Sequence, residues 1–135
     1  MAFFSNLSKY KNTGLLIIRV GLGIMFIFHG YPKLLGGPDK WATIGDATKH
    51  LGINFFPVGW GLMAAVTETF GGFLILVGLA FRPTTILLSF VMLVAAIMHL
   101  KTGGGLKAAS HAIEIAIVFI GLTFIGPGKY SADKK

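Results

Sequence analysis

The sequence of 135 residues contains no cysteine and few charged residues. Without a thiol, the chain can form no disulfide and can supply no thiolate ligand to zinc or to an iron–sulfur cluster. Charged residues make up 13% of the chain and hydrophobic residues 54%, whereas a soluble domain usually carries about 25% charged residues. This composition excludes a disordered chain, a disulfide scaffold and almost any soluble enzyme.

Long apolar stretches account for the shortage of charge. Four windows, 14–31, 59–81, 84–100 and 108–126, contain only three charged residues between them. Each has about the length that an α-helix needs to cross roughly 30 Å of hydrocarbon, and none shows the polar stripe of a helix in a soluble bundle. The sequence therefore predicts an all-α integral membrane protein in a lipid bilayer, with four transmembrane helices in a single domain, 1–135. The predicted spans are approximately 13–35, 58–81, 83–101 and 108–126.

The loop between the first two spans is predicted to contain a short interfacial helix. Residues 36–38, Gly-Gly-Pro, end the first span. Over residues 39–51, side chains that include Trp41 and Ile44 then recur at near-helical spacing, which is typical of an amphipathic helix at a membrane surface. The alternative is an ordinary loop in which Trp41 anchors the chain at the membrane interface.

The basic balance of the chain, a net charge of +7, fits a membrane surface better than nucleic acid. Lysine and arginine are spread over the termini and loops, where anionic lipid headgroups attract them, and no nucleic-acid partner is expected. Four spans place both termini on one side of the membrane. Arg82, in the short turn between the second and third spans, favours cytoplasmic termini because basic residues in short loops tend to remain on that side.

Three charged side chains lie inside the predicted spans: Arg19, Glu68 and Glu114. Such residues cost several kcal/mol when unpaired in lipid, so they usually face the interior of a bundle. At a rise of about 1.5 Å per residue, Arg19 and Glu68 fall near the midplane. We expect them to form a buried ion pair that fixes helix register, with Glu114 as the alternative partner of Arg19 and a catalytic role as the alternative function.

One face of the first span is predicted to point inward. It carries Arg19, Gly23, Phe26, Gly30 and Lys33 at steps of three and four residues. Glycines also recur in the second span, and small residues let helix backbones approach closely in lipid. We therefore expect the first and second helices to be in contact.

Counting along the spans also places three histidines, each from a different helix, in one layer near the side opposite the termini. The layer comprises His29, His99 and His111, with Lys33 above it and Glu114 below it. It is interpreted as a pocket for a quinone headgroup, whose carbonyl oxygens need hydrogen-bond donors and whose reduction needs protons. His29 and Glu114 are the candidates for proton exchange, while Lys33, His99 and His111 are the candidates for binding the headgroup.

Other uses of the histidines remain open. Each could be an ordinary structural residue that is hydrogen-bonded near the membrane interface. Two of them could ligate haem b as an axial pair, or three could hold a metal ion, but nothing in their spacing selects either arrangement. Haem therefore ranks below the quinone, and no metal site is assigned.

The same residues carry a family resemblance. The stretch from Arg19 to Lys33, with its His-Gly pair at positions 29 and 30, resembles the opening signature of the DoxX family of small bacterial four-helix membrane proteins. The agreement continues through Glu68, His99 and Glu114 to the ending Gly-Pro-Gly-Lys-Tyr-Ser at 126–131. The resemblance implies a bacterial plasma-membrane protein of redox character. Related members resemble membrane subunits of thiosulfate:quinone oxidoreductase, or partners assembled with superoxide dismutase and a sulfurtransferase.

Three functions follow from these observations as hypotheses. The leading one is a membrane subunit that exchanges electrons with the quinone pool for a soluble redox enzyme. The second is a small proton-coupled transporter in which Glu68 exchanges the proton, which would require a homodimer because four spans in one chain are few for a transport pathway. The third is a membrane anchor without chemistry that recruits soluble redox enzymes through the loop at 36–57.

Overall fold

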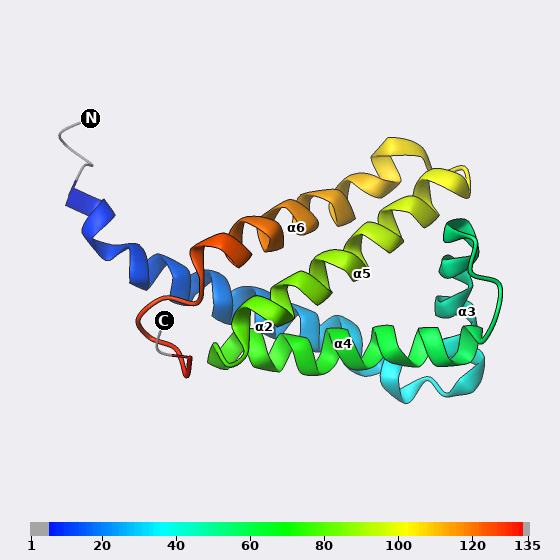
Figure 1. Cartoon of the computed structure of the whole chain (residues 1–135), viewed down its shortest axis with the longest axis horizontal. Helices are drawn as coiled ribbons and strands as arrows, with labels where there is room; N and C mark the ends of the chain where they lie inside the picture. The colour runs from blue at the N-terminus through cyan, green and yellow to red at the C-terminus, as the bar shows by residue number, and fades with distance from the viewer. Residues whose placement is uncertain (1–5, 134–135) are drawn as a thin grey trace.

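Four long helices make up most of the computed structural model, which describes residues 6–133 (Figure 1). Each is long and apolar enough to cross a membrane, so the predicted all-α, four-span fold is confirmed. Residues 1–5 and 134–135, which the predicted domain also includes, lie outside the described part. A short 3-10 helix, η1 (Asn6–Tyr10), leads into the first span. The spanning helices are α2 (Lys11–Leu35), α4 (Pro57–Val77), α5 (Phe81–Lys101) and α6 (Gly105–Ile125).

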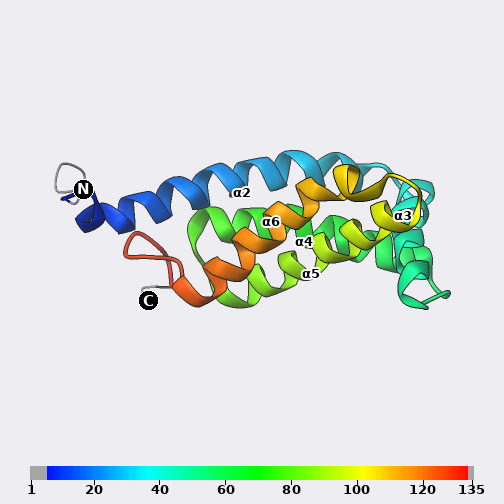
Figure 2. The same cartoon turned by 90° about the horizontal axis from the view of Figure 1, so that it is seen from above.

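The helices are arranged as two pairs. Helix α2 packs along α4, and α5 packs along α6, whereas the contact between α4 and α5 is much smaller. Figure 1 shows that the two pairs lie close together near the α4–α5 turn and diverge toward the α5–α6 turn. Helix η1 and the segment that follows α6 lie at the same end of the bundle (Figure 2). The four spans therefore form a bundle that opens toward the end opposite the termini.

Glycines set the close approach of α2 to α4. A Cβ atom on Gly23 would lie 2.6 Å from the carbonyl oxygen of Gly72, and one on Gly30 would lie 2.7 Å from the backbone nitrogen of Thr69. Any side chain at these positions would push the two helices apart. The predicted contact between the first two spans is thus confirmed. The predicted inward face is also present, since the buried residues of α2 are Arg19, Gly23, Phe26 and Gly30.

Aromatic packing joins the two helix pairs. The rings of Phe26 on α2 and Phe119 on α6 meet edge to face, with their centroids 5.2 Å apart. This geometry aligns the positive edge of one ring with the negative face of the other. Nearer the α5–α6 turn, the core consists of alanines at positions 96, 109 and 112, which lets these two helices lie close together.

The first loop is a structural part of the bundle. It forms α3 (Pro38–Gly45) and the 3-10 helix η2 (Asp46–Leu51), so the predicted short helix is present in two pieces. A Cβ atom on Gly61 of α4 would overlap the carbonyl oxygen of Trp41, and one on Gly45 would overlap the carbonyl oxygen of Pro57. Helix η2 also contacts α5. The loop therefore packs against the first half of α4, along which α2 does not extend.

Candidate functional site

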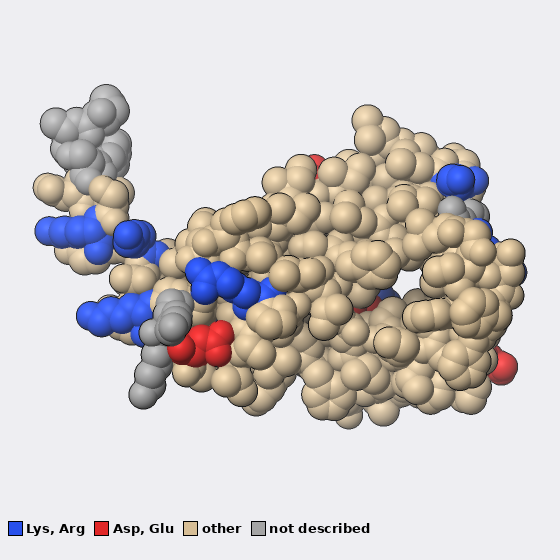
Figure 3. Space-filling view, viewed as in Figure 1, with Lys and Arg blue, Asp and Glu red and all other residues tan. Residues whose placement is uncertain are grey.

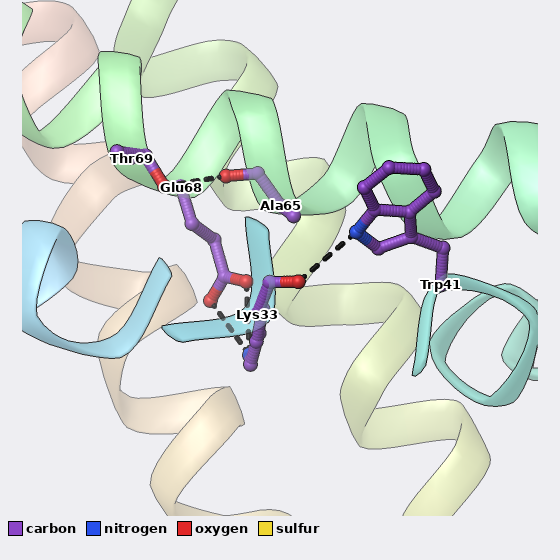
Figure 4. A network of polar contacts seen from close by, with 5 residues as sticks. All are labelled: Lys33, Trp41, Ala65, Glu68 and Thr69. Atoms are coloured by element: carbon purple, nitrogen blue, oxygen red, sulfur yellow. Dashed lines mark hydrogen bonds and ion pairs between the residues drawn. The ribbon is translucent and has the colours of Figure 1, made fainter. Parts of the chain in front are cut away.

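A partly buried ion pair joins Lys33 of α2 to Glu68 of α4 within the bundle (Figure 4). The Nζ atom of Lys33 donates to Oε2 of Glu68 at 2.9 Å and to Oε1 at 3.2 Å. The side chain of Glu68 is 5% exposed, whereas that of Lys33 is 34% exposed. The carboxylate is therefore buried in the bundle, whereas its lysine partner is partly accessible from outside.

Glu68 lies near the middle of a helix that is long and apolar enough to cross a membrane. Glu68 is the twelfth of the 21 residues of α4, so it lies about 15 Å from either end of the helix. Lys33 reaches it because Gly30, one turn earlier, lets α2 pack directly onto α4. A Cβ atom on Gly30 would lie 2.9 Å from Cβ of Glu68.

The first loop holds the end of α2 in place beside this pair. Nε1 of Trp41, on α3, donates to the carbonyl oxygen of Lys33 at 3.0 Å (Figure 4). The backbone N–H of Gly36 donates to the same oxygen at 3.2 Å. This carbonyl belongs to the last turn of α2, whose oxygens lack partners within the helix. Trp41 thus fixes the backbone from which the Lys33 side chain extends.

Figure 3 shows a hollow in the face of the molecule between the diverging helix pairs and α3. Acidic and basic atoms are visible at its edge. Among residues 6–133 the only buried carboxylate is that of Glu68. The divergence of the pairs therefore brings the outside close to a charged group in the interior.

The predicted ion pair between Arg19 and Glu68 is wrong. Arg19 is 2% exposed and donates to four backbone carbonyls instead. Two of them, of Ile75 and Leu76 at 3.1 and 2.9 Å, are in the last turn of α4. The other two, of Pro127 and Tyr130 at 3.3 and 2.8 Å, are in the segment after α6. A guanidinium group suits this role because it has five N–H donors and no acceptor.

The error comes from the register of α2 against α4. The prediction rests on the assumption that the first and second spans begin and end at the same levels in the membrane. In the structure Lys33, the third residue from the end of α2, already lies opposite the middle of α4. Arg19 is consequently at the far end of α4, close to the termini.

The segment at 126–133 closes this end of the bundle, and sequence reasoning did not detect its contacts. The carboxylate of Asp133 accepts hydrogen bonds from the backbone N–H groups of Ala80 at 2.8 Å and Phe81 at 2.7 Å. It thereby caps the start of α5, where Ala80 has a positive φ of 49°. The only signal in the sequence is an acidic residue shortly after a Gly-Pro-Gly turn, and this pattern does not indicate which distant residues the carboxylate contacts.

The predicted layer of histidines does not form a common site. His29 lies one turn before Lys33, near the level of the middle of α4, whereas His99 is two residues from the end of α5. His29, His111 and Glu114 are exposed, and His99 is half-buried. Residues 6–133 contain no group of three histidine, aspartate or glutamate side chains that could hold a metal ion. Of the residues predicted to bind the headgroup, Lys33 alone belongs to the buried pair.

Comparison with known proteins identifies the family. The DoxX family model matches residues 14–100, which include Arg19, Lys33, Trp41 and Glu68. The chain belongs to the DoxX family. The match covers the first three spans of this DoxX protein and the loop that packs against them. The Lys33–Glu68 pair therefore lies wholly within the matched part.

The DoxX protein is also similar along nearly its whole length to curated bacterial proteins. It is 27% identical to the inner membrane protein YqjF of Escherichia coli K12, over 95% of each chain. It is 28% identical to an uncharacterized protein of Haemophilus influenzae, over 97% of this chain and 96% of the relative. It is 29% identical to the E. coli inner membrane protein YphA, over 90% and 89%. No solved structure matches.

Proposed function

We propose that this DoxX protein is the membrane subunit of an oxidoreductase system that exchanges electrons with the quinone pool, and that the Lys33–Glu68 pair receives the quinone headgroup. The observation that carries the proposal is a partly exposed lysine side chain paired with a buried carboxylate in the middle of a spanning helix. Ionisable groups at such depth are costly and usually mark function. We further expect the protein to lie in the bacterial inner membrane with cytoplasmic termini.

The chemistry of a quinone fits the donors and acceptors of the pair. An ammonium group has three N–H donors, and two of those on Lys33 are directed to Glu68. The third can donate to a quinone carbonyl oxygen, which acquires negative charge as electrons arrive. The exposed side of Lys33 gives access, while the burial of Glu68 keeps its carboxylate next to the ammonium group.

The proposed reaction is the reduction of a quinone by two electrons and two protons to a quinol. The electrons come from a reduced redox centre of a soluble partner enzyme. One proton passes from Nζ of Lys33 to the nearer quinone oxygen, and the lysine regains it from water through the hollow. The second oxygen takes its proton from water. Glu68 stays in place and holds the lysine in position throughout.

Fluorescence of Trp41 provides the test, because this side chain is bonded to the backbone of Lys33. The chain has two tryptophans, so a Trp60→Phe variant leaves Trp41 as the single reporter. A short-chain quinone titrated into the purified protein is expected to quench Trp41 in a saturable way. Lys33→Met should weaken this binding at least about tenfold, as expected for loss of a charged hydrogen-bond donor.

Lys101→Met is the matched control, since Lys101 is an exposed lysine at the end of α5. It should bind the quinone like the parent protein. Quenching that does not saturate, or that is the same in the Lys33 and Lys101 variants, would contradict the proposal.

A proton-coupled transporter is the second candidate, and the buried mid-membrane position of Glu68 favours it. A carboxylate that takes up and releases a proton could couple that proton to the movement of a substrate. Uptake into proteoliposomes that is driven by a pH gradient and lost in Glu68→Gln would support this function. Uptake that Glu68→Gln leaves unchanged would exclude it.

A further inference from the structure

Glu114 occupies an unusual position on the outer surface of the bundle. It is the tenth of the 21 residues of α6, so it lies about 14 Å from one end of the helix and about 17 Å from the other. It is exposed, and Figure 3 shows acidic atoms at the surface over α6. Among residues 6–133, neither the side chain of Glu114 nor that of His111 has a hydrogen-bond or ion-pair partner. A carboxylate that faces lipid at this depth costs several kcal/mol, so the position calls for a polar partner from outside the chain.

The residues around Glu114 form a continuous exposed stripe along α6, on the side of the helix opposite its buried alanines. Its members follow one another at steps of four and three residues, the spacing by which one helix packs along another. Gly121 adds a place for close approach, because a Cβ atom there would have nothing within 4 Å. The stripe comprises Lys107, His111, Glu114, Val118, Gly121 and Ile125.

We infer that this stripe is the interface with a second copy of the same chain. Two copies with the same orientation in a membrane are related by a twofold axis along the membrane normal, so each residue meets its own counterpart at the same depth. His111 lies three residues from Glu114, about 4.5 Å along the helix axis. Across the axis, the imidazole of one copy can therefore reach the carboxylate of the other, and the contact occurs twice.

The residue types of the stripe favour a second copy of the chain as the partner. A twofold interface must be complementary to itself, and a histidine donor next to a carboxylate acceptor on one face meets that requirement. An apolar groove of about 470 Å³ between α2 and α6 borders the stripe at Val118. A helix packed on the stripe would also shield the mouth of this groove. The pairing needs no ligand, so it is independent of the proposed quinone site.

Cysteine cross-linking tests the interface, because the chain has no cysteine of its own. Val118→Cys, on the stripe, is expected to form disulfide-linked dimers in native membranes under mild oxidation. Leu87→Cys is the control, because Leu87, on α5, is 56% exposed and so more accessible than Val118, which is 39% exposed. Equal cross-linking at both positions, or a product in which Val118→Cys joins a different protein, would overturn the inference.

Exchange of the two polar residues tests the pairing itself. In the Val118→Cys background, Glu114→Ala or His111→Ala should lower the dimeric fraction about tenfold at limiting protein density, because each removes both charge-assisted contacts. The double variant His111→Glu with Glu114→His carries the same groups in reverse order and should restore dimers. Dimers unaffected by the single changes, or a double variant no better than they are, would refute the pairing. Both residues are exposed, so the bundle interior is untouched.

Discussion

Removal of one partner at a time from the Lys33–Glu68 pair should have unequal effects on stability. In Lys33→Met the carboxylate of Glu68 loses both hydrogen bonds that the ammonium donates, and its side chain, 5% exposed, has little access to water. Breaking a buried ion pair in this way typically costs 3 to 5 kcal/mol. Because the lysine side chain is 34% exposed, solvent already screens part of the attraction between the two charges. We therefore expect the free energy of unfolding to fall by about 2 to 3 kcal/mol.

Glu68→Gln should be the milder change. It leaves the amide in a hydrogen-bonding position, and the lysine side chain can direct its ammonium group toward the outside along its flexible stem. We expect a loss of about 1 kcal/mol. The double variant Lys33→Met with Glu68→Gln should be more stable than Lys33→Met alone, because no charge then remains buried.

The free energy of unfolding can be measured by titrating the protein in detergent micelles with sodium dodecyl sulfate and following helix content by circular dichroism. Lys101→Met, at an exposed position, should stay within about 0.5 kcal/mol of the parent protein. A larger loss in Glu68→Gln than in Lys33→Met would refute the reasoning. So would a coupling energy in the double-mutant cycle below about 0.5 kcal/mol, which is the level of independent sites.

Two further variants examine the helix contact and the closing segment. Gly30→Ala should destabilise the bundle by about 1 to 3 kcal/mol, because its Cβ would lie 2.7 Å from a backbone nitrogen of α4; Gly14→Ala, with nothing within 4 Å, should be neutral or slightly stabilising in the same titration. Arg19→Lys should release the segment after α6, because one ammonium group cannot serve all four carbonyls. Trypsin should then cleave after Lys129 several-fold faster than in the parent protein, and an unchanged cleavage rate would contradict the role given to Arg19.

The sequence predicts the helices better than it predicts their register. Apolar length identifies each span, and the four helices of the structure begin and end within a few residues of the predicted bounds. The three- and four-residue spacing also identifies the buried face of α2, because periodicity reports which way a side chain points. Neither property reports how far one helix is displaced along another.

That displacement decides the partners of the ionisable residues. Depth counting paired Arg19 with Glu68, whereas the glycine contact between Gly23 and Gly72 shifts α2 until Lys33 takes that place. Aligning the two helices by their glycines, which allow close approach, predicts the observed register better than aligning them by their ends. The contacts of Asp133 could not be foreseen at all, since they join distant segments without a shared pattern.

The closure of the bundle by residues 126–133 has a consequence for the order in which the protein is made. These residues leave the ribosome after all four spanning helices, yet they supply two of the four carbonyl partners of Arg19, a residue of the first helix. They also bring the carboxylate that caps α5. Insertion into the bilayer and completion of the fold are therefore separate events. A chain released before this segment is translated would hold four inserted helices around an arginine with half of its partners missing.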